Sequence, residues 1–364
     1  MTQPSQPLSL LFLSTPVGAL GTGEGGGVEL TIKNLAQDLL HSQHHVKIVA
    51  PTGSYFENLP IETIAGNLQI PAQGEGRDAP IQLPENSVLA NLCDYAREVQ
   101  SDYDLIVNFA FDWLPFYLTP FFQTPIAHFI SMGSMSDALD EIMTQTITRF
   151  PETFGVYTRT QAETFPFSEA CRCLSSGLDL SLYEFSPKSN DSLVWLGRIA
   201  PEKGLEDAVA AVQQLDIPLK IFGWMQDEAY WQEICKQYPN APIEYGGFLS
   251  TTELQKAIRE CRGLLMTPRW VEAFGNVAIE ALACGIPVIS YRRGGPAEIV
   301  RDGKTGFLVE PDRVEGLVQA IDRLDEIDRL ACRQQAEEEY SLSALRDRFL
   351  AWFYDILQRD QVEP

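Results

Sequence analysis

Short apolar runs alternate with longer segments of helical spacing along the chain. In the first half the pattern predicts a helix at 28–40 and strands at 8–13, 46–50, 105–109, 126–130 and 155–158. In the second half it predicts strands at 193–197, 219–223, 243–245, 264–266, 288–290 and 306–309. Strands that alternate with helices form parallel sheets. The chain is therefore predicted to be an α/β protein with two doubly wound, Rossmann-like domains.

The boundary between the two predicted domains lies close to Gly177, where the last strand of the first half gives way to the polar stretch 186–192. We predict a first domain over 1–181 and a second domain over 182–342. The end of the chain, 343–364, repeats apolar residues at helical spacing. A helix with such a face must bury it, and we expect this helix to cross back to the first domain.

The composition restricts the classes of partner. The chain has 364 residues, with 27 Lys and Arg against 50 Asp and Glu, and a formal net charge of −23. A surface this acidic repels nucleic acid and anionic membranes. The longest apolar zone, 105–130, is interrupted by three prolines, and the chain starts without a basic leader. We therefore expect a cytoplasmic protein without a membrane span.

The seven cysteines show neither an even framework nor the paired spacing of a zinc site, which fits reduced thiols. We expect neither a metal ion nor a cofactor. The oligomeric state is left open by the sequence.

Two glutamates, Glu272 and Glu280, stand eight positions apart around a glycine-asparagine step. A strand is predicted before them and a helix after the step, so Glu272 falls in the loop and Glu280 just inside the helix. The N–H groups at such a helix start can hold a phosphate, and carboxylates on either side can accept hydrogen bonds from sugar hydroxyls. This pattern is typical of a nucleotide-sugar site, and two solvated charges are the alternative.

Two cations, Arg198 and Lys203, follow the strand predicted at 193–197. In a protein this acidic a diphosphate needs local positive charge. Each opposite charge about 4 Å away contributes about 4 kcal/mol at an effective dielectric constant of 20. The two residues are therefore candidates for diphosphate binding, with solvated surface bases as the alternative.

A glycine-rich loop at 16–27 contains the pattern G-x-G-x-x-G over 21–26. This loop is too long for the tight turn of a dinucleotide fold, and the second strand is not followed by an acid for a ribose hydroxyl, so a nicotinamide cofactor is not expected. Consecutive glycines before a helix still allow the backbone to approach a bulky ligand closely. A flexible loop that closes on the substrate is the alternative.

Two features of the first domain have two interpretations each. His128 stands near the end of a predicted apolar strand, where it either points toward a ligand or is a satisfied core histidine. The segment 109–117 is rich in aromatic residues, which either stack on a flat ligand or belong to the core.

Together these motifs resemble the family 4 retaining glycosyltransferases of the GT-B fold. The likeness rests on 198–204, 272–280, 294–298 and 303–309, and the glycine loop, His128 and 177–179 follow in family order. It implies two Rossmann-like domains that face each other across a cleft. More narrowly, 14–18, 25–30, 111–115 and 128–133 resemble the cyanobacterial pteridine glucosyltransferases. Those enzymes move glucose from UDP-glucose to a tetrahydrobiopterin-type acceptor.

The resemblance implies a role for each candidate residue. Arg198 and Lys203 would bind the diphosphate and stabilise the leaving UDP, and Glu280 would hold the ribose hydroxyls. Glu272 would contact the transferred sugar, and His128 would lie at that sugar beside the acceptor. The remaining contacts would be Gly26 and Gly27 to the diphosphate, Gly223 and Phe248 near the base, the backbone of Phe274, Gly275, Asn276 and Val277 at the sugar, and Phe111, Asp112 and Trp113 at the acceptor.

The expected reaction is transfer of a hexose with retention and without a metal ion, from a nucleotide-sugar to a small acceptor. No second carboxylate is placed as a covalent nucleophile, so we expect the acceptor hydroxyl to attack on the face that the phosphate leaves. One alternative is a lipid or polysaccharide glycosyltransferase of the same fold, which would show a basic amphipathic face. A second is a binding protein that holds a nucleotide-sugar without turnover.

Overall fold

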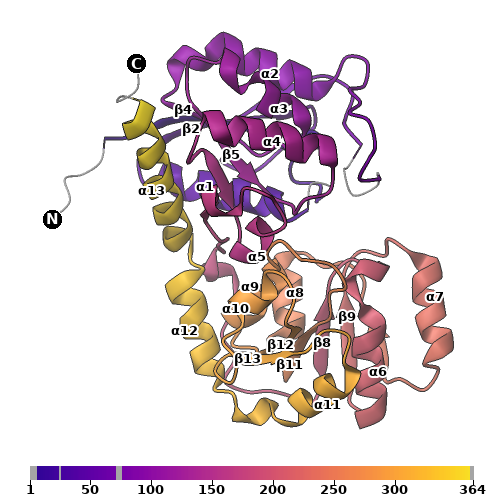
Figure 1. The fold of residues 1–364 in the computed structure, drawn as a ribbon. Coiled ribbons are helices and arrows are strands. Elements are labelled where there is room, and N and C mark those ends of the chain that lie inside the picture. The colour runs from indigo at the N-terminus through magenta and orange to yellow at the C-terminus, as the bar shows by residue number, and fades with distance from the viewer. Residues whose placement is uncertain (1–5, 24–25, 71–75, 361–364) are drawn as a thin grey trace. The chain divides into compact units, whose positions relative to one another are not determined.

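The computed structural model describes residues 6–23, 26–70 and 76–360, and the chain divides into two compact units (Figure 1). Unit 1 consists of Met1–Ser176 and Leu342–Pro364, and unit 2 consists of Gly177–Ser341. Each unit contains one parallel sheet flanked by helices. The prediction of two doubly wound α/β domains is confirmed.

The sheet of unit 1 has seven parallel strands in the order β3-β2-β1-β4-β5-β6-β7. The strands are β1 (Ser9–Leu13), β2 (His45–Pro51), β3 (Ile61–Ile64), β4 (Leu105–Asn108), β5 (Ile126–Ile130), β6 (Phe154–Val156) and β7 (Arg172–Cys173). The helices are α1 (Gly27–His41), α2 (Val88–Val99), α3 (Trp113–Leu118), α4 (Asp137–Arg149), α5 (Arg159–Ala162) and α13 (Leu342–Asp360). The strand order reverses between β1 and β4, and ligands of doubly wound sheets bind at this switch point, beyond the carboxyl ends of the strands.

The sheet of unit 2 has six parallel strands in the order β10-β9-β8-β11-β12-β13. The strands are β8 (Leu193–Leu196), β9 (Leu219–Phe222), β10 (Ile243–Tyr245), β11 (Gly263–Met266), β12 (Val288–Tyr291) and β13 (Gly306–Val309). The helices are α6 (Leu205–Leu215), α7 (Glu228–Gln237), α8 (Thr251–Ile258), α9 (Asn276–Ala283), α10 (Pro296–Ile299), α11 (Val314–Asp322) and α12 (Arg329–Glu339). Here the strand order reverses between β8 and β11, so the loops after these two strands border the expected ligand site.

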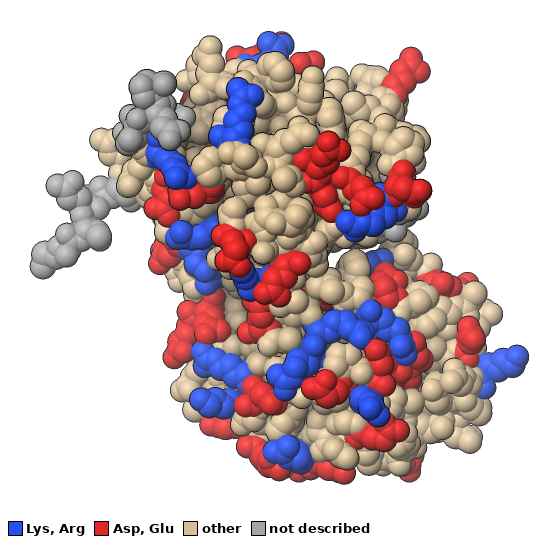
Figure 2. Space-filling model, viewed as in Figure 1, with Lys and Arg blue, Asp and Glu red and all other residues tan. Residues whose placement is uncertain are grey.

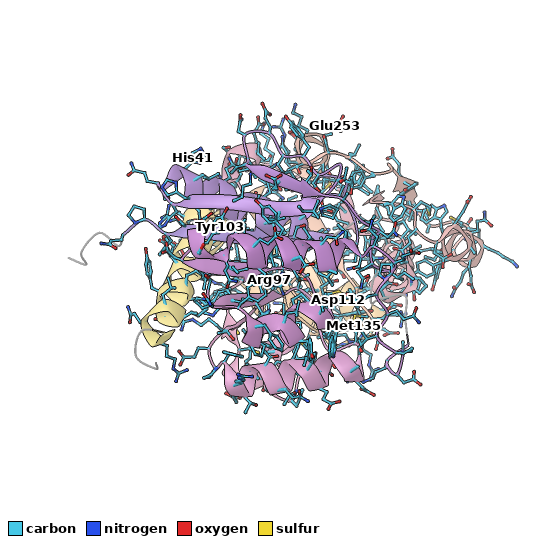
Figure 3. All side chains as sticks on the ribbon, turned by 90° about the horizontal axis from the view of Figure 1, so that it is seen from above. His41, Arg97, Tyr103, Asp112, Met135 and Glu253 are labelled. Carbon is cyan, nitrogen blue, oxygen red and sulfur yellow. The ribbon has the colours of Figure 1, made fainter. Side chains whose placement is uncertain are left out.

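Figure 3 looks down on unit 1 and places Asp112 and Met135 on one side of it, with His41 on the other. His41 ends α1, just before β2 begins, whereas Asp112 follows the carboxyl end of β4. His41 and Asp112 thus mark the two ends of the parallel sheet of unit 1. The chemistry-bearing loops of unit 1 lie at the end marked by Asp112.

Charged side chains of both signs lie next to one another on the surface of each unit (Figure 2). In unit 1, for example, Arg77 pairs with Asp137 and Asp140 at 2.7 and 2.8 Å. In unit 2, Arg293 and Asp312 pair at 2.7 Å. Such ion pairs neutralise some acidic side chains locally, while the formal net charge stays at −23. Each pair adds little to stability at an exposed position.

The C-terminal helix α13 belongs to unit 1, as predicted. It packs against α1, and the Arg346 guanidinium donates to Asp38 Oδ2 at 2.9 Å and to Ser42 Oγ at 2.8 Å. Its apolar face is fully buried, and the Phe349 ring lies 5.2 Å from that of Phe129 on β5. This helix therefore completes the core of unit 1.

Replacing Trp352 by alanine is expected to lower the free energy of unfolding by about 3–5 kcal/mol. The side chain is 1% exposed, and its indole N–H donates to the Glu152 carbonyl oxygen at 2.7 Å. The variant would lose this hydrogen bond and leave a cavity beside Gly155, whose missing Cβ makes room for the ring. Urea unfolding followed by far-UV circular dichroism measures the change. Tyr354→Ala on the more exposed face is the control and should cost about 1 kcal/mol; equal costs would contradict this packing.

Candidate functional site

In unit 2, the loops after β8 and β11 are tied together by hydrogen bonds. The Thr267 hydroxyl donates to the Gly204 carbonyl oxygen at 2.7 Å, and the Trp195 indole N–H donates to Thr267 Oγ1 at 3.3 Å. The backbone N–H of Arg269 donates to the backbone carbonyl oxygen of Glu202 at 2.9 Å. A Cβ on Gly204 would meet the Thr267 carbonyl oxygen at 2.1 Å, so the close approach requires glycine. These contacts bring the predicted cation loop against the predicted glutamate loop.

Lys203 and Glu272 meet where the two loops converge. The Lys203 ammonium forms an ion pair with Glu272 Oε2, and the Trp270 indole N–H donates to the same oxygen at 3.0 Å. The Lys203 Nζ atom also lies 5.0 Å from the centre of the Trp270 ring. The ammonium has three N–H donors, so it can hold this carboxylate and an anion at the same time.

Arg198 lies in the same loop as Lys203 but has different partners. Its guanidinium donates to Glu202 Oε1 at 2.9 Å and to Gln226 Oε1. The Gln226 contact joins the loop after β8 to the loop after β9. To bind a diphosphate, Arg198 would have to share or exchange these two acceptors.

The start of α9 is shaped by three glycines. Gly275 has a φ of 101° and forms the N-cap. Gly295 donates its N–H to the Glu272 carbonyl oxygen at 2.7 Å, and a Cβ on Gly294 would come within 2.5 Å of the Glu272 nitrogen. Phe274 is buried, so it can offer backbone rather than its ring to a ligand. The first N–H groups of α9, at Asn276 and Val277, are the ones that a helix start leaves without intrahelical partners.

Glu280 lies one turn into α9. The Tyr183 hydroxyl donates to its Oε1 atom at 3.1 Å. Burial raises the pKa of the Glu280 carboxyl to about 7, although the hydrogen bond from Tyr183 partly opposes the shift. Glu280 is therefore partly protonated near neutral pH. The sequence did not predict Tyr183 as a partner of Glu280, because 97 positions separate the two residues and Tyr183 belongs to no motif.

Gly223 and Phe248 follow the neighbouring strands β9 and β10. The Gly223 N–H donates to the Gly247 carbonyl oxygen at 2.9 Å, and the Tyr245 hydroxyl donates to the Gly223 carbonyl oxygen at 2.8 Å. The Phe248 side chain is 74% exposed. The two residues thus lie at the same edge of the sheet as Arg198 and Lys203, and an exposed aromatic ring there offers a stacking surface.

In unit 1, the glycine loop is held by Glu29 at the start of α1. The Glu29 Oε2 atom accepts hydrogen bonds from the N–H groups of Gly21 at 2.8 Å and Gly23 at 3.2 Å. Gly26 has a φ of 67° and precedes Gly27, the first residue of α1. Gly25 lies outside the described residues. Glu29 was missed from the sequence, although an acid in the first helical turn is a common partner for such N–H groups.

His128 lies in the core and not at a ligand surface. It is the middle residue of β5 and is completely buried. Its Nδ1 atom lies 3.2 Å from Asn108 Nδ2 and its Nε2 atom 2.9 Å from Thr119 Oγ1. Burial lowers the pKa of the imidazole to about 3, so the ring is neutral at physiological pH. The expected position beside a sugar is therefore corrected, because both ring nitrogens already have partners in the core.

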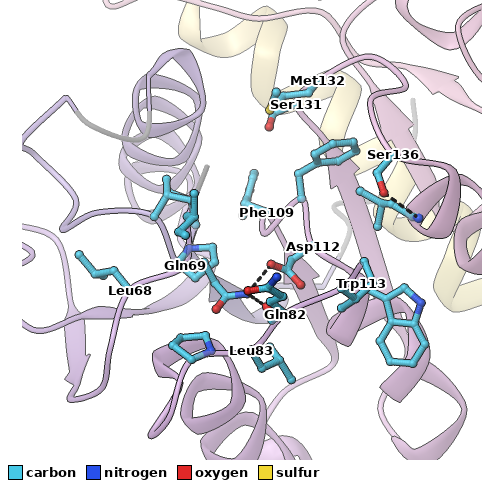
Figure 4. A pocket seen from close by; sticks show the side chains of 18 of the residues that line it. Leu68, Gln69, Gln82, Leu83, Phe109, Asp112, Trp113, Ser131, Met132 and Ser136 are labelled. Carbon is cyan, nitrogen blue, oxygen red and sulfur yellow. Dashed lines mark hydrogen bonds between the residues drawn. The ribbon is translucent and has the colours of Figure 1, made fainter. Parts of the chain in front are cut away.

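A cavity of about 230 Å³ opens at the switch point of unit 1 (Figure 4). Its walls come from the loops after β1, β4 and β5 and from the segment between β3 and α2. Within the aromatic segment, Phe109 and Phe116 are buried, whereas Phe111 and Trp113 are partly exposed. The cavity is lined by Phe109, Phe111 and Trp113. Asp112 lies between the last two and also lines it. One face of Trp113 stacks on Tyr117 at 4.6 Å between ring centres.

Among the described residues, no group of three or more His, Cys, Asp or Glu side chains is arranged to hold a metal ion. Within 6–23, 26–70 and 76–360, no helix has the length and apolarity needed to span a membrane.

Solved structures of glycosyltransferases share the fold of this chain. Alr3699/HepE from Anabaena, solved in complex with UDP and glucose, superposes with a TM-score of 0.76 at 18% identity, covering 96% of this chain and 100% of that one. AviGT4, a glycosyltransferase involved in avilamycin A biosynthesis, gives a TM-score of 0.71 at 16% identity, covering 97% and 98%. At these identities the likeness establishes the fold alone, which is the GT-B fold of glycosyltransferases.

Sequence comparison finds a known family over most of unit 2. Residues 184–339 match the family described as Glycosyl transferases group 1. An uncharacterised glycosyltransferase of Methanocaldococcus jannaschii is 32% identical over 128 residues, which are 35% of this chain and 36% of that protein. Glycogen synthase of Mycobacterium tuberculosis is 30% identical over 163 residues, covering 41% and 38%. The chain thus spans little more than a third of the length of these curated relatives.

Proposed function

We propose that the protein is a retaining glycosyltransferase that moves a hexose, glucose from UDP-glucose, to a small hydroxylated acceptor of the tetrahydropterin class. The observation that carries the donor half of this proposal is the meeting of Lys203 and Glu272 at the switch point of unit 2. This pair would offer a cation to the diphosphate and a carboxylate to the sugar hydroxyls.

The rest of the donor site would be built around this pair. Arg198 would add a second cation, and the N–H groups at the start of α9 would add partial positive charge. Glu280 would hold the ribose hydroxyls, with Tyr183 orienting its carboxylate. The base would lie toward Gly223 and Phe248. Gly26 and Gly27 would approach the diphosphate from the glycine loop.

In the proposed reaction, stabilisation of the leaving group is the main catalytic contribution of the protein. The bond between the sugar C1 atom and the phosphate oxygen breaks as the acceptor oxygen bonds to C1 on the same face. The acceptor proton passes to the departing diphosphate. Negative charge grows on UDP during this step, and Arg198, Lys203 and the helix start would stabilise it. None of these groups requires a metal ion as an intermediary.

The proposal is tested by incubating the protein with UDP-glucose and tetrahydrobiopterin. Release of UDP together with a glucosylated pterin supports it, and an α-anomeric proton signal in the product establishes retention. UDP-glucose binding without release of UDP, with every pterin and sugar acceptor tried, would instead indicate a binding protein.

The enzymatic alternative is transfer to a lipid or a polysaccharide. Lys33 is the only Lys or Arg on α1, so this helix lacks the basic face that membrane docking requires. The cavity of about 230 Å³ is also smaller than the roughly 300–1,000 Å³ of pockets for drug-sized ligands. Both observations favour a small acceptor.

Donor affinity is expected to depend on pH through Glu280. Its carboxyl pKa is raised to about 7, and only the ionised form accepts hydrogen bonds from both ribose hydroxyls. The affinity for UDP-glucose should therefore fall about tenfold as the pH is lowered from 8 to 6. Isothermal titration calorimetry at the two pH values measures this affinity. The phosphates of UDP-glucose do not titrate in this range, so the change in affinity would come from the protein. The Glu280→Gln variant should bind UDP-glucose weakly at both pH values. If the affinity of the wild-type protein did not depend on pH, Glu280 would not be the group that binds the ribose hydroxyls.

A further inference from the structure

The cavity of unit 1 offers hydrogen-bond acceptors on one side. Gln69 and Asp112 both line it, and Gln69 is only 7% exposed. The Gln69 amide nitrogen donates to Asp112 Oδ2 at 2.8 Å and to the Gln82 carbonyl oxygen at 3.2 Å (Figure 4). Since both partners are acceptors, the orientation of the amide is determined, and its oxygen faces away from them.

The amide oxygen of Gln69 also indicates a ligand. Gln69 Oε1 is buried and finds no hydrogen-bond partner among the described residues. Buried polar atoms are normally paired, and leaving one unpaired is costly. A ligand with N–H or O–H groups would supply the partner.

The other walls of the cavity are apolar. Four large side chains at its rim are unusually exposed, namely Leu68 at 44%, Ile70 at 70%, Ile81 at 41% and Leu83 at 45%. Exposed apolar side chains gathered around a cavity mark a ligand surface. Together with Phe111 and Trp113 they would bury the faces of a flat ring. The volume of about 230 Å³ suits one or two fused rings rather than a saccharide chain.

We propose that Asp112 and Gln69 determine the acceptor specificity by reading the edge of a planar heteroaromatic ring that carries adjacent N–H donors. The edge of a 2-amino-4-oxopyrimidine has this chemistry: its amino group and ring N–H donate to the Asp112 carboxylate, and the second amino proton is available to Gln69 Oε1. A 2-oxo ring places an acceptor at the same position, opposite the two acceptors of the protein. This inference rests on the proposed function, since the ring is taken to be the acceptor.

The test compares two ligands that differ at this edge. Biopterin carries the 2-amino group, and the corresponding lumazine carries a 2-oxo group in its place. In the presence of UDP, fluorescence titration of the wild-type protein should give at least tenfold higher affinity for biopterin. Asp112→Asn should lower biopterin affinity at least tenfold and remove the discrimination, and Gln69→Leu should weaken it less. Asp94→Asn, an exposed carboxylate on α2, is the matched control and should behave as wild type.

The outcomes separate this inference from the proposed function. Equal affinity for the two ligands, or an unchanged Asp112→Asn variant, would overturn the inference. The inference would also be overturned if neither biopterin nor the lumazine bound, while UDP-glucose still raised the thermal unfolding temperature of the wild type and both variants. In that case the donor half of the proposed function would stand. Absence of any response to UDP-glucose would overturn the proposed function itself.

Discussion

Replacing Lys203 by alanine is expected to lower the kcat for sugar transfer about 100- to 1,000-fold, the usual effect of removing one group that stabilises developing negative charge. The variant would also leave Glu272, now without its ammonium partner, beside the departing diphosphate. Arg198→Ala should have an effect of the same order, because both cations face the same charge in the proposed site. Initial rates of UDP release at saturating acceptor measure the change.

Lys188→Ala is the matched control for both variants, since Lys188 is an exposed lysine of the same unit. It should leave kcat within about twofold of the wild-type value, as expected for a surface charge. Thermal unfolding of all three variants separates lost catalysis from lost folding. Wild-type turnover by both Lys203→Ala and Arg198→Ala would refute the leaving-group argument.

Gly223→Ala is expected to lower the free energy of unfolding by about 3 kcal/mol or more, and to abolish donor binding with it. Gly223 has a φ of 146°, and a Cβ there would lie 1.8 Å from the Gly197 carbonyl oxygen. The loops after β8 and β9 would have to separate, because neither backbone can give way without losing its hydrogen bonds. Chemical unfolding and UDP-glucose titration measure the two effects.

Gly247→Ala is the control that isolates the steric cause. Gly247 also has a positive φ, 75°, but no atom lies within 4 Å of its would-be Cβ. It should cost only the strain of the left-handed backbone, about 1–2 kcal/mol. Similar losses for the two variants would show that backbone strain, and not the contact with Gly197, makes glycine necessary at 223.

Much of the fold was predictable because most strands are buried on both faces and read as continuous apolar runs. The predicted bounds 126–130 and 306–309 agree with those of β5 and β13. The bounds 243–245 also agree with those of β10, although this edge strand is partly exposed. The strands β3 and β7 were missed. β3 is a partly exposed edge strand, and β7 consists of two exposed residues, so neither carries a hydrophobic pattern.

The same double burial explains the correction of His128. All five residues of β5 are buried, so the strand has no alternation of polar and apolar positions from which to infer the direction of a side chain. The sequence placed His128 in a strand but could not show which face it occupies. Its partners Asn108 and Thr119 come from β4 and from the segment after α3, and only the folded chain brings them together.

Part of the candidate site of unit 2 was predictable for a different reason. Each of Lys203 and Glu272 follows a recognisable strand, and parallel sheets place such loops at one edge. That the two loops are neighbours depends on β8 pairing with β11 across a reversal of strand order. The sequence alone does not state that pairing. The same limit applies to Gln69, which meets Asp112 across 43 residues through a segment without regular secondary structure.

The central claim is that Arg198, Lys203, Glu272 and Glu280 surround one nucleotide-sugar. A crystal structure of the protein with UDP-glucose tests this most directly. We predict the diphosphate within hydrogen-bond distance of Arg198 and Lys203, the glucose against Glu272 and the ribose hydroxyls on Glu280. Density for UDP-glucose at any other site, with the Lys203–Glu272 ion pair undisturbed and Glu280 bonded to Tyr183 alone, would contradict the account.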